Sequence, residues 1–443
     1  MMEYCMSIRE FKYMADYLHQ GVGVPLSKAF SYPYGKGMYW RNYPDFSFIL
    51  VYLEDYVKKA DNSYTLLIDF FTVYDYLRFE EFFHGEQAEN DEKEPPHSSF
   101  IKVDNYISQD APIKDTHYFL DLNMLKGRMV SMESGGIEGF SILYNLVLQK
   151  ELEGGNATLM YLAGSMVYPQ WVFRSLQQVV PFPTFASNNL ELMVYDVWQG
   201  NFNEIKEGDC ARLVFDAGTE LLDGTVPFLS VLGKLQKELT NGLPLFVLSH
   251  WHTDHYSLLF ALTNAELKRI QGFVFPSFVR NLSVFLFLLR LRIAGCNVTM
   301  INLPYSTPWV AHIQNGSAMK LYANKYVKSN TNNSGLTVFV EGATNNVMLA
   351  GDCRYRIVES QANDAIRNTM HNGQTHYLVV PHHGGLAGKV SYQISNAQSV
   401  DGIVSVGARN RHKHPNRGVL GQLGVFLRSI DRTDVSGDVI KKL

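Results

Sequence analysis

The second half of the 443-residue sequence predicts a layered α/β fold, with outer helices packed on strands. From about residue 190 onward, short apolar segments bounded by glycine, aspartate and asparagine recur, and several of them end in histidine or aspartate. Helical patterns such as VPFLSVLGKLQKEL (226–239) lie between some of them. Strands that present polar side chains at their ends, with helices outside, are typical of a layered α/β arrangement.

The first half predicts an α+β domain without a motif to which chemistry can be attached. SIREFKYMADYLHQGV (7–22) predicts a helix that ends near a glycine, and the β-branched and aromatic runs 46–57 and 63–77 predict strands. The acidic, proline-containing run 85–99 predicts an exposed loop, and 139–155 and 168–183 predict helices.

The length suits two domains better than one. We expect an accessory α+β domain over 1–188, whose role the sequence does not indicate, and a catalytic domain over 189–443. A hydrophobic fraction of 46% and a charged fraction of 19% indicate a folded globular protein. The formal net charge of −4 gives no general attraction for nucleic acid, so any basic binding surface must be local.

Cysteine usage and apolar runs favour a cytoplasmic protein. The four cysteines are widely separated and predict reduced thiols, and the charged N-terminal segment predicts no secretion signal. LSVFLFLLRLRIAG (282–295) is interrupted by Arg290 and Arg292, so we expect a buried or amphipathic helix and no membrane span.

The segment SHWHTDH (249–255) gathers metal-ligating residues directly after an apolar strand. His250 and His252 share a face of an extended segment, so both can bind one ion. Asp254 and His255 follow where the strand gives way to a turn or helix, and they can bind a second ion. Histidine and carboxylate ligands suit catalytic Zn²⁺, and Mn²⁺ or Fe accept the same set.

Two metal ions need more ligands than these four, and later strand ends offer them. Asp352 in VMLAGD is placed to bridge two ions, and His382 and His383 in VVPHHGG follow another apolar run. His414 in GARNRHKHP follows a further one. The sequence therefore predicts a two-metal centre at one edge of the strands.

The H-x-H-x-D-H pattern after a strand resembles the metallo-β-lactamase fold, a four-layer αβ/βα sandwich with its metal site at one edge. The order of segments is most similar to the soluble metallo-β-lactamase-like domain of ComEC-type DNA-uptake proteins. The resemblance covers about residues 190–425 and rests on seven segments: YDVWQGNFNEI (195–205), LVFDAGT (213–219), SHWHTDH (249–255), NTNNSGLTVFV (330–340), LAGD (349–352), VPHHGG (380–385) and VGARNRHKHP (406–415).

The resemblance implies roles for these residues. One ion would be held by His250, His252 and a histidine of the His382–His383 pair. The other would be held by Asp254, His255 and His414. Asp352 would bridge the ions, and Asp216 would orient a ligand histidine from behind. Many members of the fold place another ligand histidine before the bridging aspartate, where this chain has only His312, so we expect the His382–His383 pair to substitute.

Such a centre would activate water for hydrolysis. We assign catalytic roles to Asp254, which would orient the nucleophile, and to His383 and His414 as candidate proton donors. Local positive charge favours a phosphodiester substrate, possibly in nucleic acid. The side chains that could contact phosphate are Arg354, Arg409 and Arg411, with Arg356, Lys413 and Arg417 nearby.

Three alternatives stay open from the sequence. The same fold could hydrolyse an amide or lactone, which would need an apolar pocket in place of arginines. It could be a mononuclear iron oxygenase. It could also be a binding or sensing module in which metal only holds the structure. The sequence identifies neither the metal nor the oligomeric state.

Overall fold

The computed structural model describes most of the chain from residue 189 onward and parts of the chain before it. The described residues are 48–70, 75, 79, 99–106, 111–121, 129–134, 142–145, 160–161, 185, 189–221, 228–277, 281–303, 309–311, 319–324, 330–355, 357–358, 374–388, 400–408 and 410–443. The chain divides into two compact units, one formed by Met1–Leu176 with Phe278–Leu289 and the other by Gln177–Ser277 with Arg290–Leu443.

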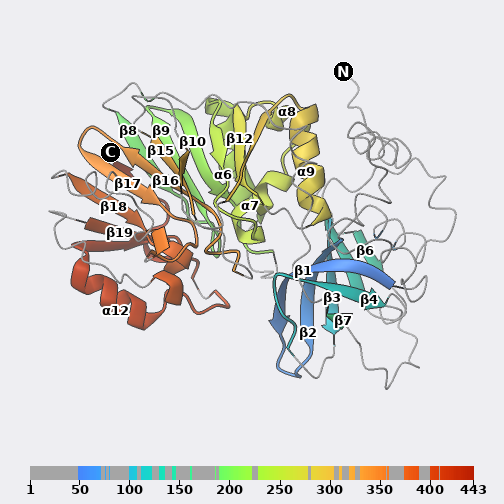
Figure 1. Cartoon of the computed structure of the whole chain (residues 1–443). Coiled ribbons are helices and arrows are strands. Elements are labelled where there is room, and N and C mark those ends of the chain that lie inside the picture. Colours follow the sequence, from blue (N-terminus) through green and yellow to red (C-terminus); the bar gives the residue numbers. More distant parts are fainter. Residues whose placement is uncertain are drawn as a thin grey trace. The chain divides into compact units, whose positions relative to one another are not determined.

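The first unit contains a seven-stranded antiparallel sheet, drawn in blue to teal in Figure 1. Its strand order is β6-β5-β3-β2-β1-β4-β7. The strands are β1 (Phe48–Lys58), β2 (Tyr64–Phe70), β3 (Ser99–Tyr106), β4 (Thr116–Asp121), β5 (Met129–Ser134), β6 (Ile142–Asn145) and β7 (Met160–Tyr161). The strand expected in 46–57 is confirmed as β1, and the strand expected in 63–77 is confirmed over Tyr64–Phe70 as β2, whereas Asp75 is helical.

One expectation for the first unit is wrong. Helical spacing over 139–155 predicted a helix, but Ile142–Asn145 forms a strand that pairs with β5. Pairing with a neighbouring strand outweighs a weak local helical pattern. The helices expected over 7–22 and 168–183 and the acidic loop lie outside the described residues, apart from Ser99 at the end of that loop, which begins β3.

The second unit contains two seven-stranded sheets. The first has the order β13-β12-β11-β10-β9-β8-β21, and the second has the order β14-β15-β16-β17-β18-β19-β20. The first is built from β8 (Leu190–Val194), β9 (Phe202–Glu207), β10 (Cys210–Ala217), β11 (Leu245–Val247), β12 (Gly272–Pro276), β13 (Asn297–Ile301) and β21 (Val439–Lys442). The second is built from β14 (Trp309–Ala311), β15 (Met319–Ala323), β16 (Leu336–Glu341), β17 (Asn345–Leu349), β18 (Thr375–Val379), β19 (Val400–Val404) and β20 (Ser429–Arg432).

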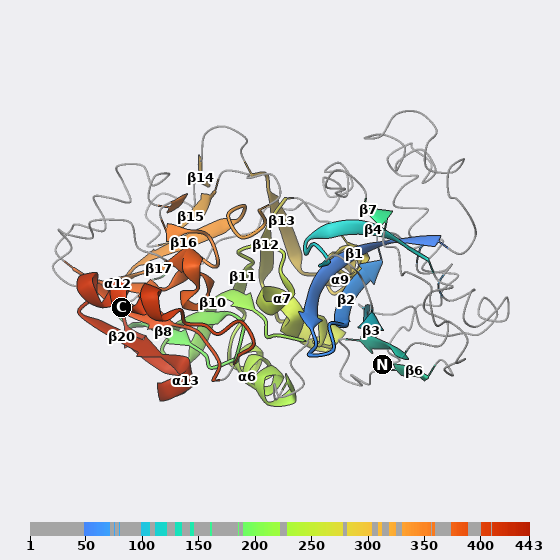
Figure 2. The ribbon, with the colours of Figure 1, turned by 90° about the horizontal axis from the view of Figure 1, so that it is seen from below.

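Helices cover the outer faces of these two sheets, which lie against one another in Figures 1 and 2. Helix α6 (Phe228–Asn241) buries Leu235 and Leu239 along one face, and its Glu238 pairs with Lys206 of β9. Helix α12 (Arg417–Phe426) packs Val419 and Leu423 into the core of the second sheet. The second unit is therefore an α/β sandwich, as the alternation of apolar strands and amphipathic helices predicted.

The other helices whose bounds the structure describes are α7 (Thr253–Phe260), α8 (Asn264–Leu267), α9 (Leu282–Ile293) and α13 (Thr433–Ser436), with the 3-10 turns η3 (Pro381–Gly384) and η4 (Leu386–Gly388). The apolar segment 282–295 is thus a helix, as expected. No helix in the described ranges combines the length and the apolar character needed to span a bilayer.

Strand direction explains why the predicted ligands gather at one edge. Strands β10 to β13 run parallel to one another in the first sheet, and β17 to β20 run parallel in the second. The carboxyl ends of parallel strands meet at the same edge of a sheet. The predicted site residues lie at the end of β10 and in the segments after β11, β17, β18 and β19.

Candidate metal centre

The segment between β11 and α7 carries four of the predicted ligands. His250 lies three residues beyond the end of β11, and His252 is the extended residue that precedes α7. Asp254 and His255 occupy the first helical turn, where a carboxylate interacts favourably with the amino end of the helix. Gly218 allows this turn to approach the end of β10, because a Cβ at residue 218 would lie 2.4 Å from the Asp254 backbone.

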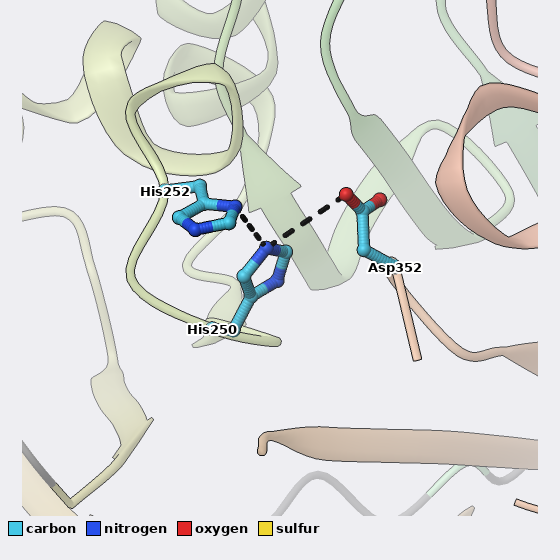
Figure 3. Close-up of side chains that lie close together, drawn as sticks. All are labelled: His250, His252 and Asp352. Carbon is cyan, nitrogen blue, oxygen red and sulfur yellow. Dashed lines mark hydrogen bonds and ion pairs between the residues drawn. The ribbon is translucent and has the colours of Figure 1, made fainter. Parts of the chain in front are cut away.

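One group of donor atoms comes from His250, His252 and Asp352 (Figure 3). His250 Nε2 lies 3.0 Å from His252 Nδ1 and 3.9 Å from Asp352 Oδ2. All three donor atoms lie within 4.8 Å of one another, and all three residues are buried. Asp352, which follows β17, therefore lies beside the two histidines that follow β11.

A second group comes from Asp254, His255 and His383. His383 Nε2 lies 3.5 Å from Asp254 Oδ2, and His255 Nε2 lies 3.9 Å from Asp254 Oδ1. Asp352 also faces this group, since its Oδ1 lies 3.2 Å from His255 Nε2 and 3.7 Å from His383 Nε2. The Asp352 carboxylate thus has one oxygen toward each group.

The donor atoms of the second group, with the Asp352 oxygen that faces it, fit a metal ion. His255 Nε2, His383 Nε2 and Asp352 Oδ1 are buried and form no hydrogen bond within the described residues. Leaving a buried polar atom without a partner costs about 1–3 kcal/mol. Three such atoms that converge on one another would gain their missing partner from a cation. Imidazole and carboxylate ligands suit zinc and iron equally well.

Backbone conformation separates His382 from His383. Both residues have a left-handed backbone, with φ of 53° and 52°, and their rings are turned 86° apart. His383 Nδ1 lies 3.0 Å from the Ser405 carbonyl oxygen, which can only accept a hydrogen bond. The His383 proton is therefore on Nδ1, and Nε2 presents a lone pair to the second group. His382 instead lies 3.1 Å from the Asn332 side-chain amide and is 30% exposed.

Asp216 supports both groups from behind. Its Oδ1 accepts a hydrogen bond from the Ser249 amide at 2.6 Å, and its Oδ2 accepts bonds from the Ser249 hydroxyl and the Asn201 amide. His255 Nδ1 lies 2.8 Å from the same Oδ2. Asp216 has a φ of 60°, a backbone conformation that non-glycine residues adopt only when their surroundings hold them in it.

Burial and neighbouring charges set the protonation of the ligand histidines. Burial, with the nearby His255 and His252, lowers the pKa of His250 well below its ordinary value. Burial has the same direction of effect on His255, but Asp352 and Asp216 outweigh it and raise the pKa of His255 well above the ordinary value. In the absence of a cation, the carboxylates therefore draw a proton onto His255.

His414 lies beside the two groups and not within them. Its ring centroid is 5.5 Å from that of His382, and a Cβ at Gly385 would lie 2.7 Å from its Cε1. Asn410 accepts a hydrogen bond from the His414 amide and donates one to its carbonyl. Burial, together with His383 and His382, lowers the pKa of His414 to about 3, so this imidazole is neutral. Its role as a ligand stays a prediction.

The predicted phosphate contacts have different surroundings. The Arg411 guanidinium pairs with the buried carboxylate of Glu220, which follows β10. Arg354 is exposed, and its backbone amide donates to the Asn333 side chain. Arg409, together with Arg356 and His312, lies outside the described residues. Because Glu220 neutralises part of the positive charge of Arg411, this side chain would attract a phosphate less strongly than its sequence context suggested.

Residues at the centre that were not singled out from the sequence include Ser249, Asn332, Asn410 and Glu220. Ser249, Asn332 and Asn410 lie inside motif segments, so their position beside a ligand was the available signal. Glu220 follows the LVFDAGT segment directly and carried no signal of its own, because its partner Arg411 is nearly two hundred residues away.

Comparison with known proteins adds little to this geometry. No family model matches the sequence, and no curated protein matches it. Among the solved structures similar to the chain is that of CmlA, a diiron beta-hydroxylase from Streptomyces venezuelae. It has 9% sequence identity, a TM-score of 0.32, and coverage of 89% of this chain and 76% of CmlA. At that TM-score the similarity carries no assignment of fold or chemistry.

Proposed function

We propose that residues 189–443 form a metallo-β-lactamase-fold catalytic domain that hydrolyses its substrate with two metal ions, and that residues 1–188 are accessory. The observation that carries this proposal is the pair of buried ligand groups that share Asp352 at one edge of an α/β sandwich. The order of the segments 195–205 to 406–415, which resembles ComEC-type domains, supports it further.

In this proposal, His250, His252 and Asp352 would hold one ion, and Asp254, His255 and His383 would hold the other, with Asp352 facing both groups. When bound, two such ions lower the pKa of a water molecule and neutralise developing negative charge. The centre accepts Zn²⁺, Mn²⁺ or Fe on ligand chemistry alone.

The chain's own residues supply orientation and proton handling. Asp254 Oδ1 and Oδ2 lie beside His255 and His383, so this carboxylate can also orient the attacking water. His382 and His414 lie together outside the two ligand groups, and His382 is partly exposed. We assign to this pair a hydrogen bond to the leaving oxygen, which the N–H of a neutral imidazole can donate.

The substrate proposed is a phosphodiester, as a nuclease or phosphodiesterase would use. The exposed cations Arg354, Lys413 and Arg417 flank the strand ends that carry Asp352 and His414, and they can attract a phosphate or a nucleic-acid backbone. Arg411 is assigned a different role because it is paired with Glu220.

Metal analysis and a chelator-controlled assay of the full chain test this function. We expect about two metal ions per chain and hydrolysis of bis-p-nitrophenyl phosphate that a chelator abolishes and added metal restores. Asp254→Ala and His255→Ala should remove activity with the fold intact. Activity on nitrocefin or a lactone in place of the diester would overturn the phosphodiester assignment. A metal-free, chelator-insensitive protein would overturn the metal-dependent hydrolase.

A further inference from the structure

We propose that Ser249 is a positioning residue that sets which nitrogen of His250 binds metal, an inference that rests on the proposed metal site. Ser249 is buried directly before the first ligand histidine, and its hydroxyl lies between Asp216 and His250. The number of protons that these groups can donate decides the arrangement of their hydrogen bonds.

Asp216 acts only as an acceptor. Its Oδ1 faces the backbone N–H of Ser249, and its Oδ2 faces the side-chain N–H of Asn201. The Asn201 amide has this orientation because its oxygen accepts a hydrogen bond from Asn203. Neither N–H group can accept a proton, so a carboxylate between them is satisfied only by receiving hydrogen bonds.

The Ser249 hydroxyl can donate one hydrogen bond, and it donates that bond to Asp216. The Ser249 Oγ lies 2.8 Å from Asp216 Oδ2 and 2.9 Å from His250 Nδ1. If Ser249 gave its proton to His250, a hydroxyl lone pair would face a carboxylate oxygen at 2.8 Å, which is repulsive. Ser249 therefore donates to Asp216 and accepts from His250, so His250 is protonated at Nδ1.

This tautomer gives His250 Nε2 a lone pair on the side where the ligands converge. Nε2 lies 3.0 Å from His252 Nδ1 and 3.9 Å from Asp352 Oδ2. His255 Nδ1 lies 2.8 Å from the same Asp216 oxygen, so its Nε2 is directed toward the second group in the same way. One carboxylate thus fixes ligands of both ions, directly for His255 and through Ser249 for His250.

Glycine at residue 351 gives the Ser249 hydroxyl its space. Gly351 has a φ of +54°, and a Cβ there would lie 2.5 Å from Ser249 Oγ. The glycine before the bridging Asp352 therefore serves two purposes: it allows the left-handed turn, and it leaves room for the hydroxyl.

The first test measures the His250 tautomer in the metal-free full-length chain, by ¹⁵N NMR of histidine-labelled protein with His250→Gln for assignment. The matched control is Ser257→Ala, because Ser257 is also a buried serine whose hydroxyl, among the described residues, bonds the Thr219 backbone and no ligand histidine. We expect Nδ1 protonation of His250 in the wild type and Ser257→Ala, and a shift toward Nε2 protonation in Ser249→Ala. Nε2 protonation in the wild type, or an unchanged tautomer in Ser249→Ala, would overturn the proposal. If Ser249→Ala does not fold, Ser249→Cys takes its place, because cysteine has a similar side-chain volume and its thiol is a weaker hydrogen-bond donor. We expect Ser249→Cys to shift the His250 tautomer partly toward Nε2 protonation.

The second test measures Zn²⁺ affinity by competition with a chelator. We expect Ser249→Ala to weaken one of two binding events by about 10–100-fold, and Ser257→Ala to leave both unchanged. Equal Zn²⁺ affinities in the two serine variants would contradict the positioning role. Absence of Zn²⁺ uptake by the wild type would instead overturn the proposed metal site, and the tautomer measurement would still decide the hydrogen-bond arrangement at Ser249.

Discussion

His382 and His383 show how much a single residue's surroundings decide. They are adjacent in the sequence, yet the Ser405 carbonyl fixes His383 with its Nε2 toward Asp254, whereas His382 faces the Asn332 side chain. The sequence could predict only that one of the pair would be a ligand. Choosing between them required the left-handed turn and the two hydrogen-bond partners, neither of which local sequence contains.

Glu204 provides a residue-scale prediction about pH. This carboxyl is buried on β9, where burial raises its pKa to about 7 although the Tyr195 hydroxyl donates to it. Because the folded state holds the proton more tightly than the unfolded state, the wild type loses stability as the pH rises from about 4.5 to 7.

The substitution Glu204→Gln removes this titration. We expect the free energy of unfolding of Glu204→Gln to rise, relative to that of the wild type, by about 3 kcal/mol between pH 4.5 and 8, so that the variant becomes relatively more stable. Denaturant unfolding at several pH values measures the difference, and comparing the same pair at each pH cancels any fixed packing cost of glutamine. A difference that does not change with pH would contradict the buried, proton-holding carboxyl.

At the scale of elements, the loop 405–416 contacts segments that follow strands of both sheets of the sandwich. Arg411 reaches Glu220 after β10, and Asn416 donates its amide hydrogen to the Gly384 carbonyl in η3. The same loop carries His414, which Asn410 holds at both backbone atoms. We infer that the Arg411–Glu220 pair positions this loop.

Arg411→Ala should therefore destabilise the fold, by about 3 kcal/mol, because it leaves the Glu220 carboxylate buried without its cation. The double variant Arg411→Ala with Glu220→Gln should recover most of that loss. Denaturant unfolding of the wild type, both single variants and the double variant gives the coupling. Additive effects would show that the pair does not stabilise the loop, and a change confined to phosphodiester binding would restore Arg411 as a substrate contact.

Two substitutions in helix α12 form a matched pair that tests how this helix packs on the second sheet. Leu423 is fully buried in the core of that sheet, whereas Val425, two residues later, is 76% exposed. We expect Leu423→Ala to reduce the free energy of unfolding by about 2–5 kcal/mol and Val425→Ala to change it by about 0.5 kcal/mol or less. Thermal and denaturant unfolding measure both, and equal effects would contradict this orientation of α12.

Elements were predictable from the sequence where local pattern and tertiary pairing agree. The apolar runs at 245–247, 345–349 and 375–379 are strands, and 228–239 lies in a helix, because their patterns match the layer in which each is buried. Ile142–Asn145 was misjudged because its pairing with β5 is not visible in its own spacing.

At the scale of the whole molecule, all of the proposed ligands belong to the second unit. They come from segments up to 133 residues apart, from His250 to His383, and meet because parallel strands end at the same edge. That meeting was predictable from strand-end histidines and aspartates. The Arg411–Glu220 pairing was not, since it depends on how two loops from different sheets approach each other.

The most direct test of the central claim is an anomalous-difference map from crystals of the full chain grown with a divalent metal, measured at that metal's absorption edge. The account predicts two peaks with Asp352 between them, one beside His250 and His252 and the other beside Asp254, His255 and His383. An absence of peaks at these residues, or a single peak that leaves one group without an ion, would contradict it.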